Sequence, residues 1–62
     1  MIAGTKLRQL REERSIPLGL LAKYLNISVR ILISIERNKK NLTADQMVKV
    51  CELFEITKSD LL

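Results

Sequence analysis

The sequence predicts a compact all-α domain built from five short helices. The chain has 62 residues, Leu and Ile are plentiful, and one Tyr and one Phe are the whole aromatic content. A chain of this length buries only about 60% of the surface that its unfolded form exposes, so its elements must be short and simply connected. The signals of strands and hairpins, which are sustained period-two alternation and Asn-Gly or Asp-Gly turns, are missing from the sequence.

The first two helices are predicted over residues 3–14 and 17–25. Pro17 takes the first position of the second helix, where the missing N–H of proline does no harm. Asn26 follows this helix as the expected left-handed residue, because Asn tolerates that conformation better than most non-glycine residues. The side chains expected to face inward from these helices are Leu7, Leu10, Leu21, Ala22 and Leu25.

Capping residues mark the starts of three further helices. The Ser28 hydroxyl is expected to cap a helix over residues 29–37. A Thr followed three residues later by a Gln or Asp is the signature of a capping box, and it precedes the fourth and fifth helices at Thr43–Gln46 and Thr57–Asp60. A single core is therefore predicted around Leu10, Leu21, Leu25, Leu32, Ile35, Val50 and Phe54.

The composition argues against several classes of function. The sequence has no His, so the commonest general base and any Cys/His zinc set are missing, and we predict neither catalysis nor a metal or cofactor. The single cysteine, Cys51, lacks an internal disulfide partner and is interpreted as a small buried apolar residue of the fourth helix rather than as a redox sensor. No apolar run approaches the roughly 18 residues of a membrane span, and no signal peptide is apparent. We therefore expect a cytoplasmic protein.

Positive charge is concentrated in the front two-thirds of the chain. Residues 1–40 contain nine Lys or Arg and three Glu, a net charge of +6, whereas residues 41–62 contain two Lys and four acidic residues, a net charge of −2. A basic face of this kind suits a polyanionic partner. The helix over residues 29–37 follows a sharp turn and runs into Arg37, Lys39 and Lys40, which is how a small domain presents a helix to the major groove of DNA.

Four segments of the chain carry a family resemblance. They are Leu7-Arg8-Gln9-Leu10-Arg11-Glu12-Glu13-Arg14, Leu21-Ala22-Lys23-Tyr24-Leu25-Asn26-Ile27-Ser28, Ile35-Glu36-Arg37-Asn38-Lys39-Lys40-Asn41 and Ser59-Asp60-Leu61-Leu62. Through them the chain resembles, nearly end to end and without a gap, the Cro/C1-type (Xre-like) helix-turn-helix regulators of bacteria and phages. The run from Ile35 to Thr43 is also similar to the controller proteins of restriction-modification operons, a narrower likeness that depends on one loop.

The resemblance implies a lambda-repressor-like fold over residues 1–62 and a function in transcription. It implies a homodimer on a pseudo-palindromic operator in double-stranded DNA, with the helix over residues 29–37 in the major groove. The DNA-contact positions that it implies are Leu18, Ser28, Val29, Arg30, Ile33, Ser34, Arg37, Lys39 and Lys40. At its position Arg30 can grip guanine O6 and N7 or contact a phosphate, and the cations after the helix can neutralise phosphates.

Arg11 and Glu36 match a pair that forms a salt bridge between the first and third helices in this family. Its expected role is to orient the third helix, because an exposed pair contributes only ~0–1 kcal/mol to stability. A separate expectation concerns the acidic C-terminal end. A short helix that ends in two leucines has little core left in one copy, so we predict that a second copy covers Ile56, Leu61 and Leu62.

Apolar residues occupy several positions where the family carries polar ones. They are Leu18, Leu20, Val29, Ile31 and Ile33. Three explanations remain open: Val29 and Ile33 read thymine methyl groups in DNA, the apolar face of the second and third helices binds a protein partner, or some of these side chains enter the core because the third helix is rotated. The retained positive charge favours DNA as the ligand.

Overall fold

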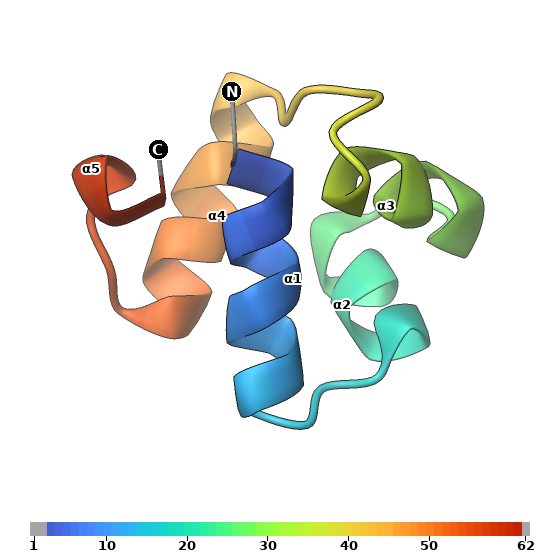
Figure 1. The fold of residues 1–62 in the computed structure, drawn as a ribbon, viewed down its shortest axis with the longest axis horizontal. Coiled ribbons are helices and arrows are strands. Elements are labelled where there is room, and N and C mark those ends of the chain that lie inside the picture. Colours follow the sequence, from blue (N-terminus) through green and yellow to red (C-terminus); the bar gives the residue numbers. More distant parts are fainter. Residues whose placement is uncertain (1–2, 62) are drawn as a thin grey trace.

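The computed structural model describes residues 3–61, which fold into five helices joined by short connections. The helices are α1 (Ala3–Glu13), α2 (Leu18–Leu25), α3 (Val29–Glu36), α4 (Ala44–Phe54) and α5 (Lys58–Leu61). In Figure 1, α1 runs down the middle of the molecule, with α2 and α3 on one side and α4 and α5 on the other. These residues contain no strand, so the all-α prediction is confirmed. None of their helices is long and apolar enough by itself to cross a membrane, and only the α2–α3 pair, bent by 100°, reaches that length and composition.

One hydrophobic core lies where the helices meet. The residues predicted to form it are all buried, and they are Leu10, Leu21, Leu25, Leu32, Ile35, Val50 and Phe54. Leu7 and Ala22, which were expected to face inward, are buried as well. Each large apolar side chain withdrawn from water contributes about 1.5–3 kcal/mol, so this cluster is the main source of the stability of a domain that measures 25 × 22 × 19 Å.

The position of Leu61 corrects one prediction. We expected Leu61 to need a second copy of the chain, but it is 0% exposed in its own subunit. The reason is that α5 folds back onto α1 and α4, so the short helix does find a core to enter. Ile56 is half-buried and also packs against this core, and Leu62 lies outside the described residues.

Each of the helices α1 to α4 is followed, one or two positions after its last residue, by a left-handed residue that is not glycine. These residues are Ser15 (φ 54°), Asn26 (φ 59°), Asn38 (φ 61°) and Glu55 (φ 55°). In each case the N–H of the next residue donates to the carbonyl five residues before it, at 2.9–3.0 Å, which satisfies a carbonyl that the helix leaves free. The next residue is an isoleucine packed against the core in three of the four, at Ile16, Ile27 and Ile56. The prediction for Asn26 is confirmed.

The helix starts also follow the sequence signals. Ser28 Oγ accepts from the Ile31 N–H at 3.1 Å, and the Thr43–Gln46 and Thr57–Asp60 pairs each exchange two reciprocal hydrogen bonds. Three boundaries differ from the prediction by one residue, and the first is the end of α1, which stops at Glu13 instead of residue 14. Pro17 has extended backbone angles (φ −64°, ψ 148°) and precedes α2 as its N-cap instead of forming its first turn. At the other end of the pair, α3 stops at Glu36, one residue before the predicted end.

Candidate nucleic-acid interface

Helices α2 and α3 form a fixed, sharply bent unit. A turn of three residues joins them, and the two helices are bent by 100°. Two helices at about 90–120° with a turn of three or four residues are the geometry of a helix-turn-helix. Leu25 of α2 and Leu32 and Ile35 of α3 are buried in the core, so neither helix can rotate without losing that packing. The rest of α3 lies at the edge of the molecule (Figure 1).

The N-terminal end of α3 is open to solvent. Ser28, Val29 and Arg30 are exposed, with 41% of Val29 accessible. Ile33 and Ser34, one turn further on, are half-buried. The structure therefore brings the predicted α3 contact positions together on one accessible strip, most open at its start.

Ser28 and Ser34, the two serines of this strip, differ in the hydrogen bonds that they can still form with a ligand. Ser28 Oγ acts as an acceptor for the Ile31 N–H, so its hydroxyl proton remains free to be donated to a phosphate. Ser34 Oγ donates to the Arg30 carbonyl oxygen at 3.2 Å, within its own helix. Ser34 can accept a hydrogen bond from a base but must break this bond to donate one.

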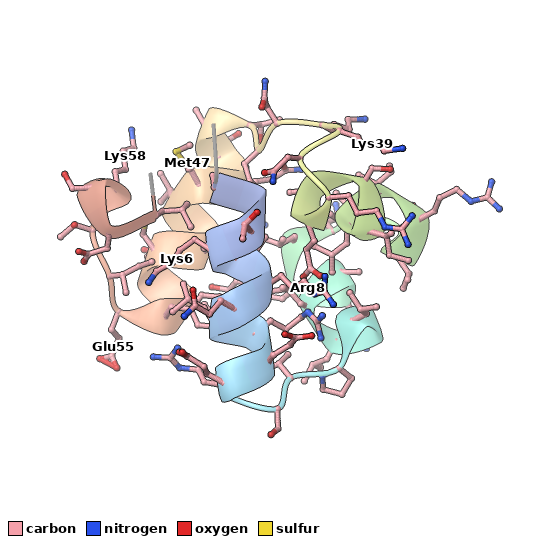
Figure 2. All side chains as sticks on the ribbon, viewed as in Figure 1. Lys6, Arg8, Lys39, Met47, Glu55 and Lys58 are labelled. Carbon is pink, nitrogen blue, oxygen red and sulfur yellow. The ribbon has the colours of Figure 1, made fainter. Side chains whose placement is uncertain are left out.

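Four exposed cationic residues lie on or after α3. Arg30 is part of the strip, and Arg37, Lys39 and Lys40 follow the end of the helix. None of them forms an ion pair with any residue between 3 and 61. Figure 2 shows Lys39 above α3, while Glu55 and Lys58 lie on the far side of the molecule. Four cations without an ion pair among residues 3–61 therefore lie at the α3 end, although other cations without an ion pair, such as Lys6 and Lys58, lie elsewhere on the molecule.

Arg11 connects α1 to the end of α3. Its Nε and Nη2 donate to the two carboxylate oxygens of Glu36 at 2.7 and 3.1 Å, and its Nη1 donates to the Ile16 carbonyl oxygen at 3.1 Å. The hydrogen bond to Glu36, together with the charges of Glu36 and Glu12, raises the pKa of the Arg11 guanidinium against the opposing effect of burial. Arg11 therefore remains charged at physiological pH, and the pair holds α1 and α3 together.

A cleft of about 200 Å³ opens beside this ion pair. It is lined by Arg8, Arg11, Leu18, Ile33, Glu36 and Arg37. The N-terminus of α2 borders the cleft, and its N-cap, Pro17, provides no side-chain oxygen for the free N–H groups of the first turn. Two of the arginines that line the cleft are already paired, Arg8 with Glu12 and Arg11 with Glu36, whereas Arg37 has no ion pair among residues 3–61. The cleft thus offers the Arg37 guanidinium and the N–H groups at the start of α2, both of which attract anions.

The apolar residues of α2 and α3 do not all gather on one surface, although Leu18 and Ile33 line the same cleft. Leu18 and Ile31 are half-buried and pack against the core. Leu20 is 59% exposed but lines a different cleft, of about 240 Å³, between α2 and α4. Of Val29, Ile31 and Ile33 on α3, only Val29, at the open N-terminal end of the helix, is exposed; Ile31 and Ile33 are half-buried.

Sequence reasoning missed Arg8 as a member of this site. Arg8 is exposed and lines the same cleft as Arg11 and Arg37, and it also pairs with Glu12 at 3.3 Å along α1. The signal was present, because Arg8 and Arg11 are three residues apart and therefore share one face of a helix. The sequence does not show that this face of α1 lies beside α3, so Arg8 could not be distinguished from an ordinary surface arginine.

One family model matches almost the whole length of the chain. Residues 7–61 match the sequence model of a family described as helix-turn-helix. The match includes α2, the turn and α3, and it extends through α4 into α5. Neither the curated proteins nor the solved structures give a significant match.

Proposed function

Because the chain belongs to the Cro/C1-type helix-turn-helix family, whose domain binds DNA, we propose that it is a sequence-specific transcriptional regulator that inserts α3 into the major groove. The observation that carries this proposal is the exposed start of α3 surrounded by cations that have no ion-pair partner among residues 3–61. A face that binds only a protein has no need of this charge, whereas a face that binds DNA uses it to neutralise backbone phosphates. We propose a repressor or operon controller that acts in the cytoplasm, where its DNA is found.

In this proposal the start of α3 reads the bases. Arg30 is exposed at the second position of α3, and its guanidinium has the geometry to hold guanine O6 and N7. Val29 precedes it and offers an apolar contact for a thymine methyl group. Ile33, one turn later and half-buried, leaves part of its side chain available for a second contact with a thymine methyl group.

Phosphate contacts are assigned to two places. Arg37, Lys39 and Lys40 neutralise phosphates beyond the end of α3, which supplies affinity without sequence information. The second place is the cleft at the start of α2. Leu18 lacks the amide that the family commonly uses there, but its backbone N–H and that of Gly19 remain available as donors, and no side chain at Gly19 obstructs them.

We further propose that the protein binds a pseudo-palindromic operator as a homodimer. The eight residues of α3 extend for only about 12 Å, enough for a few base pairs, so a second α3 one DNA turn away (about 34 Å) doubles the sequence that is read. Because Leu61 is buried, the dimer contact cannot use it. Ile56 remains a candidate contact, and sedimentation that shows only one protein chain on each DNA site would contradict the dimer.

Selection from a random DNA pool, followed by anisotropy titration, tests the main proposal. We expect the selected fragment to bind more tightly than its scrambled version, with log affinity falling linearly as log salt concentration rises. Scrambled DNA is the matched control, because it preserves every phosphate contact. Equal affinity for both fragments would overturn sequence specificity, and binding that does not depend on salt would overturn the DNA-binding role.

A protein partner is the second candidate, and one observation favours it. Leu20, Tyr24 and Leu53, which are exposed by 59%, 42% and 37%, line the cleft between α2 and α4, where every accessible lining atom is apolar. Exposed apolar residues that converge in this way mark interaction sites in many proteins. Leu20→Glu should abolish such an association and leave DNA binding intact. An unchanged complex in this variant would reject the candidate.

A further inference from the structure

Asn38, the left-handed residue after α3, makes two side-chain hydrogen bonds to the start of α1. Its Oδ1 accepts from the Gly4 N–H at 3.1 Å, and its Nδ2 donates to Thr5 Oγ1 at 2.8 Å. The partners are more than thirty residues away along the chain. Figure 1 shows why they meet, since the first turn of α1 lies at the same end of the molecule as the loop that leaves α3.

The bond to Gly4 satisfies a donor that has no partner within its helix. The first four N–H groups of a helix find no carbonyl inside it, and a buried one must be paired elsewhere. Gly4 is buried, so water is a poor substitute. Asn38 therefore caps α1 from a distance, and its second bond, to Thr5, fixes the orientation of the amide.

Gly4 allows the two segments to come this close. A Cβ atom at this position would collide with the Ile35 carbonyl oxygen and would lie 2.7 Å from Asn38 Oδ1. The helix start and the end of α3 are thus in direct backbone contact, a packing that other residues cannot reproduce without a shift. Asn38 is an exposed residue, but its side chain reaches back to this contact through its two hydrogen bonds.

The backbone of Asn38 determines the direction in which the chain leaves α3. Its φ is 61°, its N–H donates to the Ile35 carbonyl at 3.0 Å, and the Lys39 N–H donates to the Ser34 carbonyl at 2.9 Å. Lys39 and Lys40 follow directly and are both exposed. One residue therefore sets the course of the cationic loop through its backbone and attaches that loop to α1 through its side chain.

We propose that Asn38 is a positioning residue for DNA binding, which with Gly4 and Thr5 forms a clamp that holds Lys39 and Lys40 in place beside α3. This inference rests on the proposed function, because it assigns those two lysines to phosphates. A loop that is already ordered loses less conformational freedom when it binds, so the clamp raises affinity without itself touching DNA.

Asn38→Gly isolates the side chain, because glycine keeps the left-handed backbone at no steric cost. Asn26→Gly is the matched control: Asn26 has nearly the same φ, 59°, and its side chain makes no hydrogen bond to any residue from 3 to 61. Two quantities are measured on the full chain, the hydrogen-exchange rate of the Gly4 amide by NMR and the affinity for the selected DNA fragment across a salt series. Thr5→Val serves as a second variant that removes one of the two clamp bonds.

We expect Asn38→Gly to speed Gly4 exchange at least about tenfold, since the amide loses the one partner that it has among residues 3–61. We expect it to weaken DNA binding about tenfold at moderate salt, because the released loop must be ordered when it binds. The slope of log affinity against log salt should stay close to that of the wild type, because Lys39 and Lys40 still reach their phosphates. Asn26→Gly should change neither quantity, and Thr5→Val should lie between the two.

Three results would overturn this inference. Unchanged Gly4 exchange in Asn38→Gly means that the clamp does not exist. Faster exchange with the affinity of the Asn26→Gly control means that Asn38 supports the fold only. Wild-type protein that binds no DNA overturns the proposed function and the positioning role together, and the exchange rates still decide whether the clamp is present.

Discussion

Arg11 on α1 and Glu36 on α3 form a two-bonded ion pair that is largely withdrawn from water, their side chains being 12% and 6% exposed. This burial changes the energetics that we expected of an exposed pair. A buried pair contributes little net stability compared with apolar residues of the same size, but breaking it leaves one charge without a partner, at a cost of about 3–5 kcal/mol. The pair therefore matters as an intact unit that joins α1 to the helix proposed to enter the groove.

A double-mutant cycle on this pair separates orientation from stability. We expect Arg11→Met and Glu36→Met each to lower the free energy of unfolding by about 3 kcal/mol, and the double variant to recover most of the loss. Urea denaturation provides these values. The double variant should nevertheless bind DNA more weakly, because packing alone does not fix the approach of α3. If the two losses simply add, the residues are not energetically coupled.

The two glycines of the chain should respond in opposite ways to Ala. At Gly19 a Cβ meets no atom within 4 Å, and α2 loses a flexible residue, so Gly19→Ala should stabilise the domain by about 0.5–1 kcal/mol. At Gly4 the new Cβ collides with the Ile35 carbonyl, and a cost of about 1–3 kcal/mol is expected. Thermal unfolding compares the two variants directly. A stable Gly4→Ala variant would mean that α1 and α3 are not in close contact.

Two helix ends are expected to improve with glycine. Ser15 and Glu55 have positive φ values of 54° and 55°, a conformation that costs residues with a Cβ roughly 1–2 kcal/mol. Part of this cost is offset by the larger entropy of glycine in the unfolded chain, so we predict a gain of about 0.5–1 kcal/mol for Ser15→Gly and for Glu55→Gly. The free energy of unfolding in urea is the measurement. Val48→Gly, in the exposed interior of α4, should be destabilising and serves as the control.

Arg30 and Lys39 should fail in different ways when replaced by Ala. Loss of Arg30 should reduce the discrimination between the selected and scrambled fragments by about 1–3 kcal/mol, because a base contact is removed. Loss of Lys39 should weaken binding to both fragments equally and reduce the slope of log affinity against log salt by about 0.9 for each protomer bound. Anisotropy titrations at several salt concentrations measure both effects. The same pattern in the two variants would mean that Arg30 also contacts only phosphate.

Leu61→Ala should destabilise the single subunit. The side chain is completely buried among residues of its own chain, so truncation is expected to cost about 2–5 kcal/mol. The loss should be the same in dilute and concentrated protein solutions, because no second copy is involved. A loss that disappears on dilution would show that Leu61 is covered by a partner in solution.

The sequence by itself determined the helices and where they end. Ser28, the Thr43–Gln46 box and Asn26 act on backbone groups within a few residues, so their effect can be predicted without knowing the fold. The spacing of apolar residues likewise predicted most of the buried set, but it did not find Leu42, and Cys51, which was expected to be buried, is half-buried. These are local interactions and one-dimensional periodicities, and a sequence displays both directly.

Only the tertiary structure decided how the helix faces combine. Whether Leu61 is buried depends on the angle at which α5 returns to α1, and whether Leu18 and Leu20 share a surface depends on which neighbour each meets. The contact of Asn38 with Gly4 joins residues 34 apart, and no local pattern signals it. Such contacts follow from how whole helices pack against one another. That packing depends on all the buried contacts of the domain at the same time, so no single segment of the sequence reveals it.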